Sequence, residues 1–172
     1  PLLEILRERG AIHEQNYIDH LKGRGFDVVR IEGGGITKKQ VEETLAAMRA
    51  GAQVVIQGAL LDGKWEGRAD ILMRVDQPSA LGNWSYEVID TKLARETKAG
   101  AVLQLCLYSD LVQSVQGTLP EYMSIVSPWS DYEPQTYRTT DYSAYYRLVQ
   151  RSLEASAAQD EVAQTYPDPK EH

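Results

Sequence analysis

The sequence has a single cysteine, Cys106, so these residues cannot supply an intrachain disulfide, a cysteine-based zinc site or a cysteine-ligated iron–sulfur cluster. Cys106 falls within an apolar helical pattern, which predicts a small buried hydrophobic residue. The sequence also lacks an apolar run long enough to span a membrane and lacks a signal-peptide pattern. We therefore expect a cytoplasmic location.

An excess of positive charge is also missing, because 25 acidic residues outnumber 18 basic ones and give a formal net charge of -7. Proteins that hold nucleic acid by bulk electrostatics rely on clustered Lys and Arg. Any nucleic-acid activity would therefore need a local basic lining or a partner domain. What the chain does have is 172 residues that are 42% apolar and 25% charged, which suits one domain with a substantial core.

The hydrophobic periodicity predicts an alternation of helices and short strands. Helices are expected over 2–22, 37–49, 98–116 and 141–158, and strands over 26–31, 53–61, 67–75, 84–93, 122–126 and 135–139. This order is typical of an α/β (α+β) domain with a mixed central sheet flanked by helices. We expect one domain over 1–165 and a tail, or a link to a missing C-terminal region, over 166–172.

Local signals place several element boundaries. Thr37 and Gln40 form a capping-box signature at the start of the second helix, and Asp141 is expected to cap the last helix. Asp62 and Gly63 are the strongest short hairpin signal in the chain, and 76–83 contains a second turn. The three central strands should therefore form an antiparallel meander.

The third strand of this meander ends in an acid and an amine. Alternation along a strand puts Asp90 and Lys92 on one face, and Glu87 and Thr91 on the other, so Glu87 is left outside the site. Charges at the end of a central strand destabilise the fold unless they pair or bind something, and this cost suggests a functional site. Acid-x-Lys also begins at residues 62, 96 and 168, but only this copy ends an apolar, β-branched run.

A histidine lies on the expected inner stripe of the first helix, which comprises Leu6, Gly10, His13, Tyr17 and Leu21. Such a histidine is either a hydrogen-bonded core residue or a ligand, and Gly10 one turn earlier would let another group approach closely.

Three more polar residues have both a structural and a functional interpretation. Asp70 either pairs with an arginine or joins Asp90 on the adjacent strand. Gln104 and Tyr108 are four residues apart on a helix and so share one face, where they form either a simple hydrogen-bonded pair or part of a site.

Four short motifs in this order resemble those of the PD-(D/E)xK nuclease superfamily, and more narrowly the RecB-like nucleases. The resemblance covers roughly residues 8 to 130. Its motifs are a helical Gly-x-x-His at Gly10 to His13, a strand Asp after a Gly at Gly67 to Asp70, a strand ending Asp90-Thr91-Lys92, and a helical Gln-x-x-x-Tyr at Gln104 to Tyr108.

The resemblance implies a restriction-endonuclease-like core and a divalent metal, Mg²⁺ or Mn²⁺, because carboxylates are natural ligands of these ions. The implied metal ligands are His13, Asp70, Asp90 and the Thr91 carbonyl. Lys92 would orient or help to deprotonate the attacking water, and Gln104 and Tyr108 would position Lys92 or the scissile strand. The implied phosphate contacts are Arg68, Arg74, Arg95, Lys98 and Tyr108.

The function implied by this resemblance is a metal-dependent DNA nuclease, with exonuclease action on single strands or ends, in DNA repair or defence. A fused or associated helicase domain would explain how an acidic domain meets DNA, and any iron–sulfur cluster would begin after His172. The alternative is a catalytically inactive module that keeps the fold and binds nucleic acid or a protein. An α/β hydrolase acting on a small substrate has no supporting nucleophile elbow in the sequence.

Overall fold

The computed structural model describes residues 1–93 and 98–165 and contains one mixed six-stranded sheet flanked by helices. The helices are α1 (Leu2–Gly23), α2 (Lys38–Arg49), α3 (Lys98–Gln116) and α4 (Ser143–Thr165), with two short 3-10 turns, η1 (Pro128–Ser130) and η2 (Thr139–Asp141). The strands are β1 (Val28–Arg30), β2 (Val54–Asp62), β3 (Trp65–Val75), β4 (Ser85–Thr91), β5 (Tyr122–Val126) and β6 (Gln135–Arg138). The expected α+β class with a mixed sheet is confirmed, whereas the expected tail over 166–172 lies outside the described residues.

The strands lie side by side in chain order, from β1 at one edge to β6 at the other. The meander of β2, β3 and β4 is antiparallel, as predicted, and β5 pairs antiparallel with β6. The pairs β1 with β2 and β4 with β5 are parallel. Parallel neighbours need a crossover, and here α2 and α3 provide the two crossovers.

Two of the local signals act as expected. The Thr37 side chain accepts a hydrogen bond from the Gln40 backbone, and the Gln40 side chain accepts one from the Thr37 backbone, which completes the capping box of α2. The turn between β2 and β3 contains Gly63 with φ 61°, a conformation that glycine adopts without steric cost. The hairpin register therefore places β3 beside β2 over most of its length.

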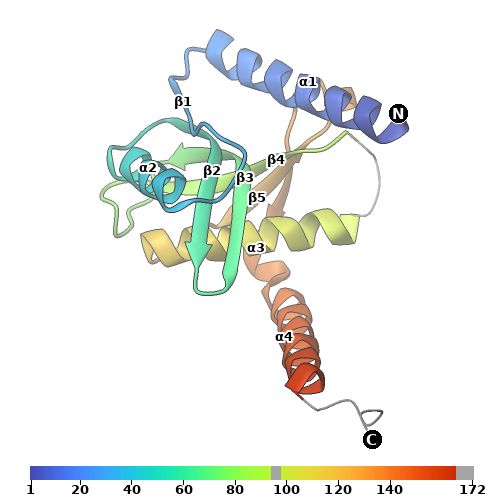
Figure 1. Cartoon of the computed structure of the whole chain (residues 1–172). Coiled ribbons are helices and arrows are strands. Elements are labelled where there is room, and N and C mark those ends of the chain that lie inside the picture. The colour runs from blue at the N-terminus through green and yellow to red at the C-terminus, as the bar shows by residue number, and fades with distance from the viewer. Residues whose placement is uncertain (94–97, 166–172) are drawn as a thin grey trace, which may run out of the picture.

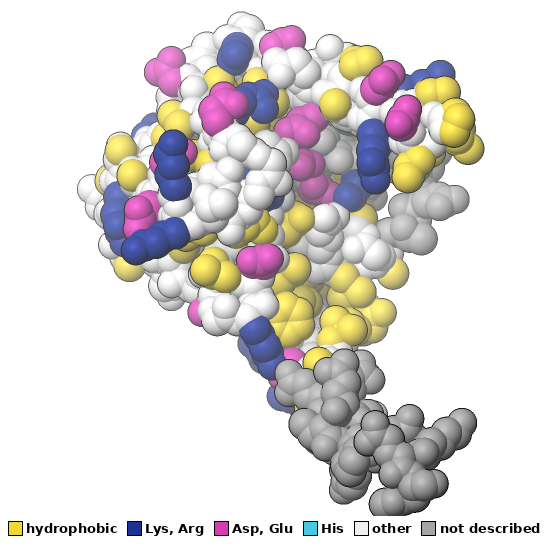
Figure 2. Space-filling view, in the orientation of Figure 1, with side chains coloured by type: hydrophobic (Ala, Val, Ile, Leu, Met, Phe, Trp, Pro, Cys, Tyr) yellow, Lys and Arg dark blue, Asp and Glu magenta, His cyan; other side chains and the backbone are white. Residues whose placement is uncertain are grey.

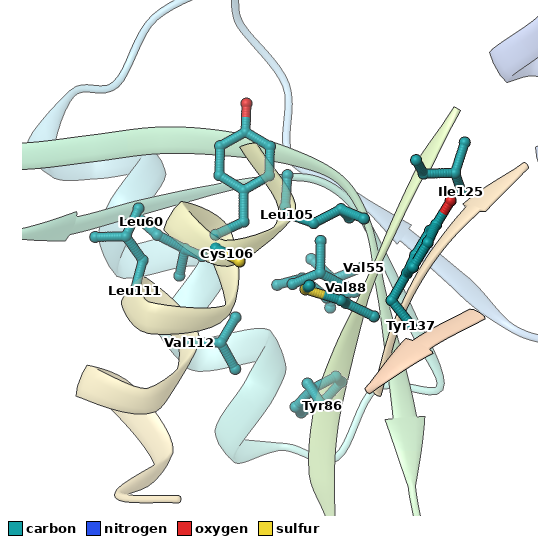
Figure 3. Close-up of a cluster of buried hydrophobic side chains, with 14 of the residues drawn as sticks. Val55, Leu60, Tyr86, Val88, Leu105, Cys106, Leu111, Val112, Ile125 and Tyr137 are labelled. Atoms are coloured by element: carbon teal, nitrogen blue, oxygen red, sulfur yellow. The ribbon is translucent and has the colours of Figure 1, made fainter. Parts of the chain in front are cut away.

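The sheet has an apolar layer on each face. One face packs against α1, where Tyr17, Ile18 and Leu21 join buried side chains of β2, β3 and β4. The opposite face packs against α2 and α3, so the sheet lies between α1 on one side and α2 and α3 on the other (Figure 1). The close-up in Figure 3 shows Leu105 of α3 among side chains of this second layer that include Val55 and Val88.

The buried cysteine lies in the same layer. Cys106 is a free, buried residue of α3, as predicted, and burial raises the pKa of its thiol to about 11. The thiolate is therefore disfavoured, and the side chain acts as a hydrophobic group.

Two expectations about helix ends and faces are wrong. Asp141 does not cap the last helix: it ends the 3-10 turn η2, and α4 starts at Ser143 and continues to Thr165. The backbone N–H of Tyr142 donates to Thr139, so the chain makes one tight turn before the helix begins. On α1, Leu6 is 45% exposed, and the buried residues of that helix start only at His13.

In Figure 1, α4 projects away from the body of the sheet. Of the helices described, none is both long and apolar enough to cross a membrane.

Candidate functional site

Two carboxylates face each other on neighbouring strands. The β3–β4 ladder ends with Ile71 paired to Ile89, and the next residue of each strand, Asp70 and Asp90, has a side chain close enough to interact with the other. Asp90 follows Val88 in the alternation and so lies toward the face covered by α3, whereas Asp70 is linked through Gln57 to Glu14 of α1 on the other face. The sequence prediction that Asp70 joins Asp90 therefore agrees with the geometry.

Asp90 is almost fully buried, with 2% of its surface exposed. Its Oδ2 lies 2.9 Å from the Lys92 ammonium nitrogen, and within residues 1–93 and 98–165 no further hydrogen-bond donor reaches that oxygen. Burial, and then the neighbouring Asp70 carboxylate, raise the pKa of Asp90 to about 8, although Lys92 acts in the opposite direction. The pair of carboxylates is thus short of positive charge.

Lys92 links this pair to α3. Its ammonium donates a 2.6 Å hydrogen bond to Gln104 Oε1, and the Gln104 amide in turn donates to the Tyr108 hydroxyl at 2.8 Å. Burial, above all, raises the pKa of Tyr108, so its phenol stays protonated. Asp90, Lys92, Gln104 and Tyr108 therefore form one continuous polar array that joins β4 to α3.

Asp70 is held by Thr91 and by Gln57. The Thr91 backbone N–H and hydroxyl both donate to Asp70 Oδ2, at 2.9 and 3.0 Å. The Gln57 amide donates to Asp70 Oδ1 at 3.2 Å. Alternation puts the Thr91 side chain on the same face as Ile89, whose layer packs against α1, and its hydroxyl meets the Asp70 carboxylate that Gln57 links to Glu14 of α1.

The sequence analysis did not identify Gln57 or Glu14 as part of this cluster. Gln57 lies in β2 and also donates to Glu14 Oε1 of α1 at 2.8 Å. Burial, followed by the charge of Asp70, raises the pKa of Glu14. Glu14 could have been noticed as the acid that follows His13 in the helical motif, but a glutamine inside an apolar strand gives no such signal.

His13 is buried at the same end of the molecule, but its contact is with the backbone. Its Nε2 is 2.9 Å from the Val126 carbonyl oxygen, which also accepts the Lys92 backbone N–H at 3.0 Å. With Nε2 donating to this carbonyl, that nitrogen has no lone pair for a metal ion. The structure thus brings His13 next to the Asp90-Thr91-Lys92 strand through the Val126 carbonyl.

The arginines expected to contact phosphate are not gathered at this site. Arg68 donates to the Ile31 and Gly35 carbonyls, and Arg74 donates to Gly51. Arg95 lies outside the described residues. Lys98 is the first residue of α3, and its side chain is outside the described part of the chain.

Glu87 lies apart from the carboxylate pair, as its position in the alternation predicted. Its Oε2 accepts the backbone N–H of Tyr122 at 3.0 Å, so it ties β4 to the start of β5.

A hollow lies beside the Glu14 and Gln57 end of this cluster. Figure 2 shows acidic side chains gathered in a hollow between α1 and α3. An open pocket of about 370 Å³ there is lined by Glu14, Gln57 and Arg30, among others. In the part of the chain that the structure describes, no three His, Cys, Asp or Glu side chains are grouped as a ready metal site. The arrangement is a pair of carboxylates with a lysine and a third acid nearby.

Comparison with known proteins adds no assignment. No protein-family model matches the chain, and a search of curated proteins found no match.

Proposed function

We propose that this chain is a divalent-metal-dependent nuclease with a RecB-like PD-(D/E)xK core, and that it hydrolyses phosphodiester bonds in DNA. The observation that carries the proposal is the placement of Lys92 Nζ 2.9 Å from Asp90 Oδ2, beside the second carboxylate of Asp70. Two acids and one amine on two adjacent central strands match the donor set that metal-assisted phosphodiester hydrolysis requires.

The carboxylates fit a hard divalent cation. Asp70 and Asp90 are oxygen donors placed together, and burial, followed by the neighbouring Asp70 carboxylate, raises the pKa of Asp90, so a bound cation would relieve the cost of its charge. These two residues would hold Mg²⁺ or Mn²⁺. When bound, the ion would lower the pKa of a water molecule and shield the charge of the phosphate.

Lys92 would act on the reacting groups directly. Its ammonium lies between Asp90 Oδ2 and Gln104 Oε1, so its direction is fixed from two sides. From that position the ammonium would orient the attacking water and stabilise the negative charge that develops on the phosphate.

Gln104 and Tyr108 would position Lys92. Gln104 accepts from Lys92 and donates to Tyr108, so the tyrosine sets the orientation of the amide and the amide sets that of the ammonium. The Tyr108 hydroxyl would also be a contact for the DNA strand.

The substrate that we propose is single-stranded DNA or DNA ends, bound with the help of a fused or associated helicase domain. The net charge of -7 and the use of Arg68 and Arg74 for backbone contacts support the need for such a partner. The same two observations favour a second candidate, a non-catalytic nuclease-like module that binds nucleic acid or a protein.

Cleavage of end-labelled single-stranded DNA distinguishes the two candidates. The nuclease cuts with Mn²⁺ or Mg²⁺, and chelation, Asp90→Asn or Asp70→Asn abolishes cutting. Glu87→Gln is the matched control, because this acid lies on the same strand but bonds to Tyr122, and it should retain wild-type activity. DNA binding without cutting under either metal would instead support the module.

A further inference from the structure

Strand β2 has one irregular residue. Gln57 has φ 57°, in the left-handed region that side chains with a Cβ rarely adopt. The pairing with β3 keeps the same register on both sides of it, because Ile56 pairs with Ile71 and Gly58 with Ala69. The conformation therefore inserts no extra residue into the strand. It does switch the face on which alternate side chains lie, because Ile56 belongs to the layer against α1 whereas Leu60, four residues later, belongs to the opposite layer. The Gln57 side chain lies at this switch.

The side chain of Gln57 lies between two acids. Its single amide nitrogen donates to Glu14 Oε1 at 2.8 Å and to Asp70 Oδ1 at 3.2 Å, so both of its N–H groups are used. A neutral double donor is suited to holding two carboxylates near each other without adding a charge. It also joins α1, β2 and β3 at one point.

The other oxygen of Asp70 is fixed as well, by the two hydrogen bonds from Thr91. Both carboxylate oxygens of Asp70 thus have a defined protein donor. Outer partners of this kind orient a ligand, and their loss typically weakens metal binding about 10- to 100-fold.

We propose that Gln57 is a positioning residue of the metal site, and that its left-handed backbone, besides switching the facing of β2, aims the amide at Asp70 and Glu14. This inference rests on the proposed function. Gln57 acts through Asp70, so its removal should weaken metal binding more than it slows the reaction at saturating metal.

Gln57→Gly tests this directly, because glycine adopts the same φ freely and removes the side chain that carries the amide. We expect a midpoint of thermal unfolding within about 3 °C of wild type, since relief of strain offsets the lost hydrogen bonds. Isothermal titration with Mn²⁺ should give a dissociation constant about tenfold higher. The kcat on single-stranded DNA at saturating Mn²⁺ should stay within about threefold of wild type.

Asp131→Gly is the matched control, because Asp131 also has a left-handed φ, of 51°, but lies in the turn after η1. It should leave Mn²⁺ affinity unchanged. Gln57→Asn covers the case in which the glycine variant does not fold: asparagine tolerates left-handed φ, yet its shorter amide cannot keep both contacts, so Mn²⁺ binding should again weaken.

The outcomes separate this inference from the proposed function. If Gln57→Gly, or Gln57→Asn where glycine does not fold, binds Mn²⁺ as tightly as wild type, the positioning role is refuted while the nuclease proposal stands. If either variant is less stable but keeps its metal affinity, the role is structural only, and the inference fails. If wild type neither binds Mn²⁺ nor cuts DNA, both proposals fail.

Discussion

Thr91 donates two hydrogen bonds to a single oxygen of Asp70, one from its backbone nitrogen at 2.9 Å and one from its hydroxyl at 3.0 Å. Because Thr91 lies between Asp90 and Lys92, the strand that carries the lysine also orients the carboxylate of the neighbouring strand. The candidate site is thus built across β3 and β4, and its residues depend on one another.

Thr91→Val should lower DNA cleavage about tenfold. Valine keeps the β-branched shape and the backbone hydrogen bond but loses the hydroxyl donor to a charged carboxylate, and such a bond contributes about 1.5 kcal/mol. The rate of cleavage at a fixed Mn²⁺ concentration measures the effect. Thr136→Val, on the edge strand β6, removes a hydroxyl that bonds Ser124 of β5 and should leave the rate unchanged. Equal rates for wild type and Thr91→Val would contradict a role for this contact.

Lys92→Met should reduce cleavage at least about 100-fold while the protein remains folded, because methionine retains the aliphatic stem and loses the ammonium. The measurement is single-turnover cleavage at saturating Mn²⁺ together with far-ultraviolet circular dichroism. Lys64→Met is the control: it belongs to another acid-x-Lys tripeptide, and its contact is a 3.9 Å ion pair with Glu154. Retention of half the activity or more by Lys92→Met would exclude Lys92 from the reaction.

The stability of the metal-free protein should fall as the pH rises through about 8. The pKa of Asp90 is about 8 in the folded protein and 3.8 when unperturbed, so the folded state binds more protons between these values. The protonated Asp90 carboxyl therefore contributes fully to stability below about pH 4, and this contribution is lost as the carboxyl ionises in its buried position.

Asp90→Asn isolates this effect, because asparagine does not ionise. Urea unfolding in chelator at pH 6 and pH 9 should show wild type losing more stability than the variant between the two values. Parallel changes in both proteins would mean that other groups cause the pH dependence, such as Glu14 and Glu87, whose pKa values are also raised by burial.

Gly67→Ala should destabilise the protein by about 1–3 kcal/mol and lower its activity, because a Cβ at this position would lie 2.5 Å from Cε1 of the Tyr108 ring. The tyrosine would have to move, and its hydrogen bond to Gln104 would move with it. Gly10→Ala is the opposite case: no atom lies within 4 Å of an added Cβ there, so the helix should gain about 0.5–1 kcal/mol. Thermal unfolding of both variants measures whether stability falls in Gly67→Ala and rises in Gly10→Ala. A stable, fully active Gly67→Ala would contradict the packing argument.

Local sequence signals sufficed for most of the fold. The capping box at Thr37, the hairpin at Gly63 and the apolar strand that ends at Asp90 each depend on neighbours a few residues away, and all three occur where expected. The prediction that Asp141 caps the last helix was wrong because aspartate is common both at helix caps and in 3-10 turns. The hydrogen bond from Tyr142 to Thr139 decides between the two structures.

The polar contacts of the site were less accessible to such reasoning. Strand alternation placed Asp90 and Lys92 together correctly, but it could not show that the Thr91 hydroxyl bonds the Asp70 carboxylate of the neighbouring strand. Gln57 was missed because its contact with Glu14 spans 43 residues and depends on a left-handed φ that its residue type does not indicate.

The central claim is that Asp70 and Asp90 hold a divalent cation, and the most direct test is an anomalous difference map from a crystal soaked in Mn²⁺. The account predicts a peak about 2 Å from carboxylate oxygens of both Asp70 and Asp90, beside the Lys92 ammonium. A fully soaked crystal with no peak there, or with its strongest peak at other side chains, would contradict the account.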